Sequence, residues 1–353
     1  LGRIGVAPDP SIGVSVKSRL CLDRTGAIVH ERVVPATNSA WDRIYRPLRE
    51  ALPDASYHAG MRLDRFEEKG GGVTATCADG PRATGELLIG ADGLTSAVRR
   101  ILLPEAEPRY AGYVAWRGVL EEDEMPPAIH AALFEHWCFC LPEGELMLTL
   151  PMPGRDDDMR VGRRRFHWCW YRPVEFTREL PLLCTDAEGH CHGVTIPPPL
   201  IRPAVIAELE AHADSVLAPQ IATLVRLTAQ KLLQPIYDLE SPVIGRGRVA
   251  LVGDAAFVAR PHVAVGVTKA ARDAECLAEA LAANRDASAA LETYDRERRP
   301  YGSALVARAR MLGAYLEGSA RGTASTPLQQ RPDVVLREYG AAGSVAETVN
   351  AAG

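Results

Sequence analysis

The feature that most constrains this chain is residues 248–256, where a short aliphatic run ends in a Gly-Asp pair. The run is β-branched and aliphatic, as in a buried strand. A loop containing Pro261 and His262 follows, and a helical pattern begins just after Gly266. Apolar residues recur there at helical spacing, and charged residues take the other face. The apolar set is Val267, Ala270, Ala271, Ala274, Leu277, Ala278 and Leu281; the charged set is Lys269, Arg272, Asp273, Glu275 and Glu279.

This order of strand, turn, loop and helix predicts a ligand site. The Asp254 carboxylate can accept hydrogen bonds from the hydroxyls of a polyol. The amides that open the helix near Gly266 and Val267 present positive partial charge to an anion or a carbonyl oxygen. A Gly-Asp pair after a strand is usually only a turn. The spacing from Pro261 to Gly266 and the helix that follows favour the ligand site, because the turn, the loop and the helical pattern all fit the same arrangement.

The stretch resembles the second flavin fingerprint of the single-component flavoprotein aromatic hydroxylases, the para-hydroxybenzoate hydroxylase-like family. The resemblance implies that Gly253 and Asp254 hold the ribityl chain of FAD. It also implies that the helix opening after Pro261, at Gly266 and Val267, faces the N1 and C2-carbonyl edge of the isoalloxazine ring.

A second motif follows an aliphatic run at residues 87–89 and reads Gly-Ala-Asp-Gly-Leu-Thr-Ser-Ala-Val-Arg over residues 90–99. The run fits a strand buried on both faces. Gly93 permits unusual backbone dihedrals, and Thr95 or Ser96 can cap the helix that follows. The motif resembles the family's Asp-Gly motif, which implies that Asp92 and Gly93 contact FAD and NAD(P)H. A tight strand-to-helix turn is the alternative.

The start of the sequence lacks the Gly-x-Gly-x-x-Gly turn with which a dinucleotide-binding fold normally opens. Residues 4–9 instead resemble the loop that follows that unit in the hydroxylases. We therefore expect an α/β protein whose Rossmann-like FAD-binding domain lacks the N-terminal β-α-β unit and carries an inserted mixed α+β substrate domain. A different fold without such a unit is the alternative.

Residues 41–52 are helical in pattern, and Pro47 fits only a first turn, so the helix proper is predicted to begin near Arg46. Family members carry Arg-x-x-Leu-x-x-x-Leu here, and their Arg meets the flavin pyrophosphate. Tyr45 stands at that position in this chain. The resemblance therefore assigns the pyrophosphate contact to Arg46 or Arg43, with an exposed helical arginine as the alternative.

Residues 110–119 alternate aromatic and small side chains, as on a sheet whose one face lines a pocket. The expected domains are residues 1–108 (first part of the FAD-binding domain), 109–240 (substrate domain), 241–316 (second part and C-terminal helix, bent at Pro300) and 317–353 (a poorly ordered tail). Arg117 either holds an oxyanionic ring substituent in the pocket or forms a surface salt bridge. Tyr113 is a further candidate for orienting the substrate.

Two local patterns have plain explanations. Residues 166–173 nearly match the Trp-x-Trp-x-Ile-Pro pattern of flavin-dependent halogenases, but Arg172 replaces the Ile, and strand alternation explains both tryptophans. A cluster at residues 184–192 holds two cysteines and two histidines. Its spacing fits no common zinc site, so we predict a polar hairpin and no metal.

Composition excludes several classes of protein. The net charge of −5 gives no support for a nucleic-acid partner, and no apolar run approaches the roughly 20 residues of a membrane span. The eight cysteines are scattered, which predicts a reducing, cytoplasmic setting. The oligomeric state stays open, with a homodimer as one option.

Within the family, the resemblance is strongest to members of the 2,6-dihydroxypyridine 3-hydroxylase type. It rests on Tyr-Ala-Gly-Tyr-Val-x-Trp-Arg-Gly and Gly-Asp-Ala-Ala-x(4)-Arg-Pro-His. It implies that NADPH or NADH reduces FAD and that O₂ is captured as the flavin C4a-hydroperoxide. One oxygen then passes to an activated hydroxypyridine-like or phenol-like ring. The alternatives are a silent or truncated remnant unable to hold FAD, a halogenase, or a reductase that makes no oxygenated product.

This chemistry calls for a base that deprotonates a ring hydroxyl. Many family members have a histidine where Phe257 stands, so Phe257 suggests an apolar wall instead. His262 is the titratable group left in the loop, with a free pKa suited to the task. A structural histidine bonded to a loop carbonyl is the equal alternative.

Overall fold

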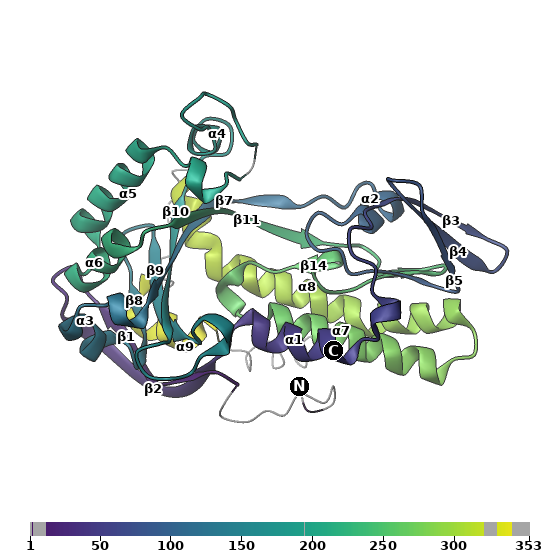
Figure 1. Ribbon diagram of the computed structural model, residues 1–353, viewed down its shortest axis with the longest axis horizontal. Helices are drawn as coiled ribbons and strands as arrows, with labels where there is room; N and C mark the ends of the chain where they lie inside the picture. Colours follow the sequence, from purple (N-terminus) through teal and green to yellow (C-terminus); the bar gives the residue numbers. More distant parts are fainter. Residues whose placement is uncertain (1, 3–11, 194, 321–329, 341–353) are drawn as a thin grey trace. The chain divides into compact units, whose positions relative to one another are not determined.

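The structure, a computed structural model, describes residues 2, 12–193, 195–320 and 330–340 (Figure 1). Residues 4–9, which the sequence compares with a family loop, lie outside this part of the chain. The chain divides into two compact units, each built from three segments. Unit 1 comprises residues 1–57, 112–236 and 314–337, and unit 2 comprises residues 58–111, 237–313 and 338–353.

Unit 1 is organised on a large sheet. Along the sheet the strand order is β11-β7-β10-β9-β8-β1-β2. The strands are β1 (Val14–Leu22), β2 (Ile28–Asn38), β7 (Arg109–Glu121), β8 (His136–Cys140), β9 (Leu146–Met152), β10 (Arg165–Pro173) and β11 (Lys231–Glu240). The pairing of β1 with β8 is parallel, whereas β7, β10, β9 and β8 pair antiparallel in turn.

One face of this sheet is covered by helices α5 (Pro203–Val216) and α6 (Pro219–Leu227), which lie side by side (Figure 1). Strand alternation turns Phe166, Trp168 and Trp170 of β10 toward one side, and all three are fully buried. The indole of Trp168 donates to the hydroxyl of Thr228 at the end of α6 (2.7 Å), and that of Trp170 stacks on His212 of α5. The two tryptophans are therefore core residues on one face of a strand, as predicted.

The remaining elements of unit 1 are short. They are the helices α1 (Trp41–Ala51), α3 (Pro127–Leu133), α4 (Glu179–Leu183) and α9 (Pro332–Glu338) and the 3₁₀ turns η3 (Asp54–Ser56), η4 (Glu122–Glu124), η5 (Arg155–Asp157) and η6 (Pro198–Leu200). Residues 184–192 form the predicted polar hairpin, in which Asp186 accepts hydrogen bonds from the His190 amide and the His192 ring.

One expectation about this unit needs correction. Helix α1 begins at Trp41 rather than near Arg46 and contains Pro47; it has no buried residue, so the carbonyl that loses its partner at the proline can bond to water. Residues 12–57 group with unit 1, because β1 and β2 extend its sheet. The expected domain bounds stay a prediction. The expected poorly ordered tail contains α9, whose Val335 and Leu336 are fully buried.

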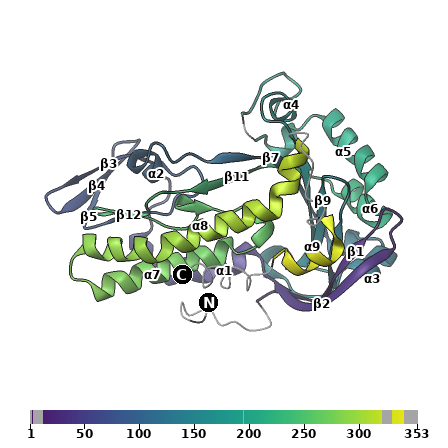
Figure 2. The same cartoon turned by 180° about the vertical axis from the view of Figure 1, so that it is seen from behind.

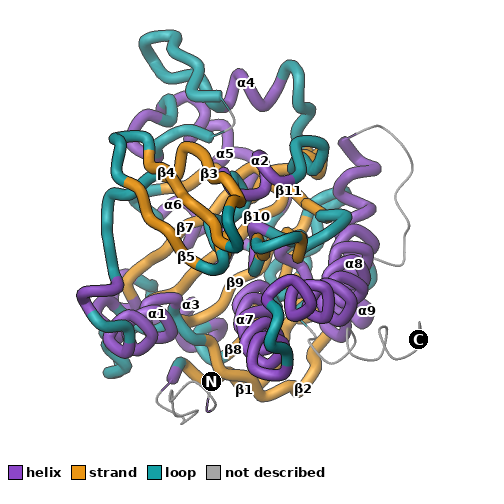
Figure 3. Tube along the Cα trace, turned by 90° about the vertical axis from the view of Figure 1, so that its right-hand side faces the viewer, coloured by secondary structure: helices purple, strands orange, loops and turns teal. Residues whose placement is uncertain are grey.

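Unit 2 contains two small sheets and a pair of long helices. The strands β12 (Gly245–Arg246), β13 (Val249–Leu251) and β6 (Leu88–Gly90) form one sheet, with β13 in the middle. The strands β3 (Leu63–Lys69), β4 (Gly72–Cys77) and β5 (Arg82–Gly85) form the second sheet (Figure 3). The strand β14 (Phe257–Val258) pairs with the end of β11. Two 3₁₀ turns, η7 (Gly253–Ala255) and η8 (Pro261–Val263), complete the loop region.

The helices of unit 2 are α2 (Ala97–Leu102), α7 (Gly266–Ala283) and α8 (Ala287–Ala320), and α8 continues into unit 1. Helices α7 and α8 run side by side, as seen from the front and from behind (Figures 1 and 2). The core of the unit joins them to β13 through Leu251, Leu277, Leu291 and Tyr294. Among the described helices, none has both the length and the apolar character needed to cross a bilayer.

Candidate functional site

The two Asp motifs, more than 150 residues apart in sequence, meet at one edge of a parallel strand pair. Strand β6 pairs parallel with β13, with Leu88 opposite Val249 and Gly90 opposite Leu251. The amide of Val252 also donates to the carbonyl of Gly90 (2.9 Å). Asp92 and Asp254 follow these strands directly, at the carboxyl edge where open α/β sheets bind ligands.

Arg99 joins the two motifs. Its side chain is 1% exposed, and its guanidinium donates to the carbonyls of Leu94, Ala255 (3.1 Å) and Ala106 (3.1 Å). Leu94 belongs to the Asp-Gly loop and Ala255 to the Gly-Asp turn, so one buried cation holds both. Sequence reasoning missed this role. The available signal was the final Arg of the motif at residues 90–99, which stands one turn into the helix that follows the Asp-Gly loop.

Asp92 caps helix α2. Its carboxylate accepts from the amides of Ala97 (2.7 Å) and Val98 (3.2 Å) and from the hydroxyl of Ser96. The Ser96 hydroxyl in turn caps the Arg99 amide, which confirms the predicted cap. Gly93 has a φ of +73°, which favours glycine. The local geometry is thus the tight strand-to-helix turn, and the contact of Asp92 and Gly93 with a cofactor stays a prediction. Asp92 also lines a cavity of about 750 Å³ in unit 2.

The Gly253–Asp254 turn presents an exposed carboxylate. Gly253 has a φ of +58°, and the Asp254 side chain reaches solvent. The surrounding protein nevertheless removes part of the carboxylate's hydration. This desolvation and the charge of Asp273 raise the pKa of Asp254, while the Lys269 ammonium opposes the rise.

The opening of α7 is uncapped. The helix has 18 residues, and its N-cap residue, Val265, makes no side-chain capping hydrogen bond. Gly266 and Val267 are exposed, and a Cβ added at Gly266 would meet no atom within 4 Å. Ala264, two residues earlier, has a left-handed φ of +51°, which is strained for a residue other than glycine. Exposed amides of a long helix and an acceptor carboxylate are thus both available in unit 2.

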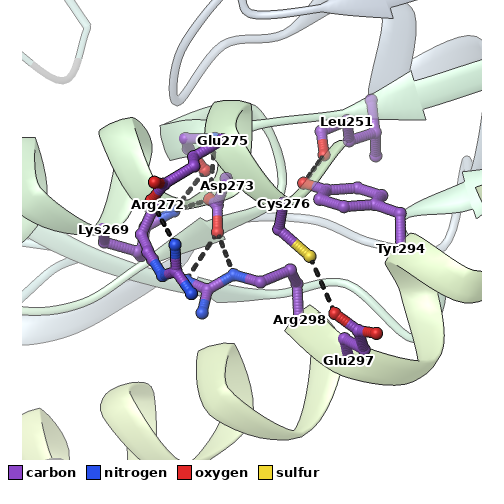
Figure 4. A network of polar contacts seen from close by, with 10 residues as sticks. Leu251, Lys269, Arg272, Asp273, Glu275, Cys276, Tyr294, Glu297 and Arg298 are labelled. Carbon is purple, nitrogen blue, oxygen red and sulfur yellow. Dashed lines mark hydrogen bonds and ion pairs between the residues drawn. The ribbon is translucent and has the colours of Figure 1, made fainter. Parts of the chain in front are cut away.

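The burial of α7 differs from the prediction. Its buried residues are Lys269, Asp273, Cys276, Leu277 and Ala280, whereas Val267 is 50% exposed. Lys269 and Asp273, assigned to the solvent face, are 1% and 3% exposed. They bond each other (3.1 Å), and Asp273 pairs with Arg298 of α8 (2.8 Å; Figure 4). Helical spacing assigned charged residues to solvent, but mutual pairing allows them into the interior.

His262 lies in η8, which begins at Pro261. The His262 side chain is 3% exposed, and its ring packs edge-on against Tyr339 at a centroid distance of 5.2 Å. Its carbonyl accepts from the Gly340 amide (2.9 Å). Burial, together with the nearby Arg260 guanidinium, lowers the pKa of His262 to about 3. So low a pKa makes the imidazole a weak base, which favours the structural alternative over a catalytic base.

Phe257 is a core residue. It is 1% exposed and packs where Gly302 of α8 leaves room, since a Cβ at Gly302 would lie 2.3 Å from the Phe257 ring. Arg260, in the same loop, donates to Asp238 (2.9 Å), which also binds Arg310 (2.6 Å). The first half of the loop between the Gly-Asp turn and α7 is therefore anchored at Phe257 and Arg260.

Tyr113 and Arg117 lie in unit 1, on the face of β7 opposite to the buried tryptophans. Arg117 pairs with Cys169 of β10, and Tyr113 packs edge-on against Tyr171. Arg117 and His167 line a cavity of about 470 Å³. Among the residues that the structure describes, the buried Nε of Arg117 has no hydrogen-bond partner and its guanidinium forms no salt bridge. Burial and the Arg117 charge lower the pKa of His167 to about 3.

Arg46, the predicted pyrophosphate contact, lies on α1 in unit 1. It is half exposed and pairs with Asp157 (3.2 Å). The structure thus gathers most of the predicted cofactor residues in unit 2, together with His262. Arg46, Arg117 and Tyr113 belong to unit 1.

Comparisons with known proteins show what this chain is similar to. A family described as an FAD binding domain matches residues 243–309, and one described as FAD binding domain-like matches residues 110–238. The chain is 29% identical over 300 residues to 2,6-dihydroxypyridine 3-monooxygenase of Paenarthrobacter nicotinovorans, which covers 84% of this chain and 74% of that protein. The chain belongs to the FAD-dependent aromatic hydroxylase group.

A further relative and a solved structure are also similar. An FAD-dependent urate hydroxylase of Klebsiella pneumoniae is 32% identical over 279 residues, and the match spans 78% of this chain but only 62% of that enzyme. The solved structure of 2,6-dihydroxypyridine-3-hydroxylase from Arthrobacter nicotinovorans matches with a TM-score of 0.83 at 28% identity, covering 92% of this chain and 81% of that one. The fold is thus that of the FAD-dependent aromatic hydroxylases, as predicted.

Proposed function

We propose that this protein is an FAD-dependent monooxygenase that hydroxylates an activated aromatic or N-heteroaromatic ring. NADPH or NADH supplies two electrons, and O₂ supplies one oxygen atom to the ring and one to water. The observation that carries the proposal is the presence, in one unit, of the exposed Asp254 carboxylate and the uncapped amides that open α7. Relatives named for oxidation of dihydroxypyridine and urate support the same reaction class.

The chemistry of unit 2 fits FAD. Asp254 would accept hydrogen bonds from the ribityl hydroxyls, with Gly253 setting the turn that aims it. The amides of Gly266 and Val267 would face the polar edge of the flavin, because a helix N-terminus stabilises partial negative charge there. Pro261 stiffens the connecting loop, and Asp92 and Gly93 would provide a second contact with FAD. Bound FAD supplies the oxygen chemistry, and these residues supply its position and field.

We assign the substrate to the face of unit 1 that bears Arg117 and Tyr113. Arg117 would bind a ring oxyanion, because the charge of its guanidinium is unused within the described chain. A nearby cation stabilises the ionised form of a phenol or hydroxypyridine, and ionisation makes the ring a better nucleophile. Tyr113 would orient the ring. The buried, neutral His262 is then a residue that shapes the loop, and its role as base stays a prediction.

Flavin binding and oxygen transfer test this function. Purified apoprotein should quench FAD fluorescence on titration and acquire the visible absorbance of bound flavin. A panel of hydroxypyridines, urate and hydroxybenzoates should include a compound that stimulates NAD(P)H oxidation and gains ¹⁸O from ¹⁸O₂. Protein that ignores added FAD would support the silent remnant. Flavin reduction without labelled product would support a reductase.

Two smaller expectations belong to the same proposal. All eight cysteines are free thiols, which agrees with a reducing, cytoplasmic setting. Light scattering on the FAD-loaded protein would decide between a monomer and the homodimer that the sequence left open.

A further inference from the structure

Lys269 is buried in a position where the sequence expects an exposed residue. Its side chain is 1% exposed, although moving an ammonium ion out of water costs several kcal/mol unless it is paired. The ammonium donates to the carbonyl of Gly253 (2.6 Å) and to the carboxylate of Asp273 (3.1 Å; Figure 4). The bond to Gly253 connects α7 to the turn that contains Asp254.

Asp273 completes this connection. The same carboxylate oxygen that binds Lys269 accepts from the Gly253 amide (3.1 Å). Both backbone polar groups of Gly253 are therefore held by one Lys-Asp pair, one turn apart on α7. The other oxygen of Asp273 binds Arg298 of α8 (2.9 Å). The left-handed Gly253 also lies against Ala270, whose Cβ is 3.3 Å from the position of an added Cβ.

The charges of this cluster balance when Asp254 is included. Lys269, Asp273 and Arg298 together carry a net charge of +1, and their side chains are at least 90% buried. The Asp254 carboxylate, next to Gly253, makes the sum zero. Lys269 and Asp273 act on Asp254 from α7 with opposite signs, and Arg298 reaches the cluster from α8 through Asp273. The Lys269 ammonium favours the anion of Asp254 and so opposes the desolvation and the Asp273 charge, which together raise the pKa of Asp254.

We propose that Lys269 is a positioning residue for flavin binding, which ties α7 to the Gly253 turn and supplies the positive charge opposite Asp254. The inference rests on the proposed function. An ionised Asp254 accepts hydrogen bonds from two ribityl hydroxyls, whereas a protonated one must donate one of its own. FAD affinity should therefore fall as pH drops through the pKa of Asp254, and Lys269 should set the pH of that loss.

The test measures FAD dissociation constants by fluorescence quenching across a pH series. Lys269→Gln keeps a donor for the Gly253 carbonyl and removes the charge. It should weaken FAD binding by about tenfold near neutral pH and move the loss of affinity to higher pH. Lys269→Arg keeps the charge and should restore the wild-type pH midpoint. Arg272→Gln removes the same charge from the exposed face of α7, beside Glu275, and should change neither quantity.

Asp273→Asn separates positioning by charge from plain destabilisation. Removing this negative charge should shift the pH midpoint downward, opposite to Lys269→Gln, although both variants lose buried contacts. If the variants only loosened the structure, the pH midpoint of FAD affinity would shift in the same direction in both, and the inference would be overturned. The ¹³C-detected titration of Asp254 in apoprotein should show the same opposite shifts.

The outcomes also separate the two proposals. Wild-type protein that binds no FAD overturns the proposed function and this inference with it. Wild-type protein that binds FAD, with Lys269→Gln binding equally well at every pH, overturns the inference alone.

Discussion

At the scale of the residue, burial decides what each polar group can do. Arg117 is a cation without an ion-pair partner in the described chain and lines a cavity, so its charge is available to a ligand. His262 is buried against Tyr339 and is neutral, so it offers no charge to a ligand. Both were candidates for the chemistry on sequence grounds. Their environments give them different capacities.

Replacing Arg117 should weaken substrate binding more than turnover. A hydrogen bond to a charged group contributes about 1.5–3 kcal/mol, so Arg117→Met should raise KM by roughly 10- to 150-fold. Arg117→Lys should recover part of this loss. The measurement is steady-state kinetics with the best compound of the panel. Arg178→Met removes an arginine that is 82% exposed and serves as the matched control. An unchanged KM in Arg117→Met would remove Arg117 from the substrate site.

Replacing His262 should alter the acid side of the stability profile. The pKa of His262 is about 3 in the folded protein and 6.5 ordinarily, so only the unfolded chain binds this proton at intermediate pH. Its contribution to stability is present above about pH 6.5 and is lost as pH falls toward 3. His262→Gln should reduce the loss between pH 6.5 and 4.5 by about 2 kcal/mol. Urea unfolding at both pH values checks this.

His58→Gln, at an exposed histidine of the same unit, is the control for that experiment and should leave the profile unchanged. If His262→Gln instead abolished hydroxylation while the stability profile stayed as in wild type, His262 would be the base after all.

At the scale of the element, close packing between the loop and α8 sets the position of the site. Phe257, directly after the Gly-Asp-Ala-Ala turn, fills the space left by Gly302. Alanine normally stabilises a helix by about 1 kcal/mol over glycine. Here the added methyl group would overlap the aromatic ring, and overpacking a well-filled core costs about 1–3 kcal/mol. The steric cost should therefore outweigh the gain in helix propensity, and an alanine at Gly302 should destabilise the protein.

Gly302→Ala should lower the free energy of unfolding by about 1 kcal/mol or more. Phe257→Leu, which shortens the facing side chain, should reduce the cost of Gly302→Ala in the double variant, because the two residues share one space. Urea unfolding of the four proteins in the cycle measures this coupling. Additive effects would show that the ring and the glycine do not compete.

At the scale of the whole molecule, the site depends on segments far apart in the chain. Unit 2 contains both the Asp-Gly loop and the Gly-Asp turn, and Arg99 bonds carbonyls of both. A ligand held at this edge binds only the folded chain. Its binding energy is therefore added to the stability of the fold.

Saturating FAD should therefore raise the Tm of the protein. At a free concentration of 100 times the dissociation constant, the added stability is about 2.7 kcal/mol. Differential scanning calorimetry with and without FAD measures the shift, and hydrogen exchange should show protection at the ends of β6 and β13 and at the start of α7. Asp254→Ala should lose most of the shift. A full shift in that variant would place the flavin elsewhere.

Much of the site could be predicted from local sequence. A buried strand followed by Gly-Asp, a proline-containing loop and an alanine-rich helix has few other solutions, because glycine dihedrals, proline and helical spacing act over neighbouring residues. The tryptophans of β10 and the Ser96 cap were predictable for the same reason. Interactions between residues close together in the chain can be predicted from the local sequence alone.

Other features depended on the tertiary structure. The pairing of β6 with β13 and the addition of β1 to the sheet of unit 1 join segments that no local pattern connects. Lys269 and Asp273 of α7 were wrongly predicted to face solvent, because a prediction from helical spacing places all charged residues on the exposed side. Their burial requires Gly253 and Arg298 as partners, and only folding brings those partners to the helix.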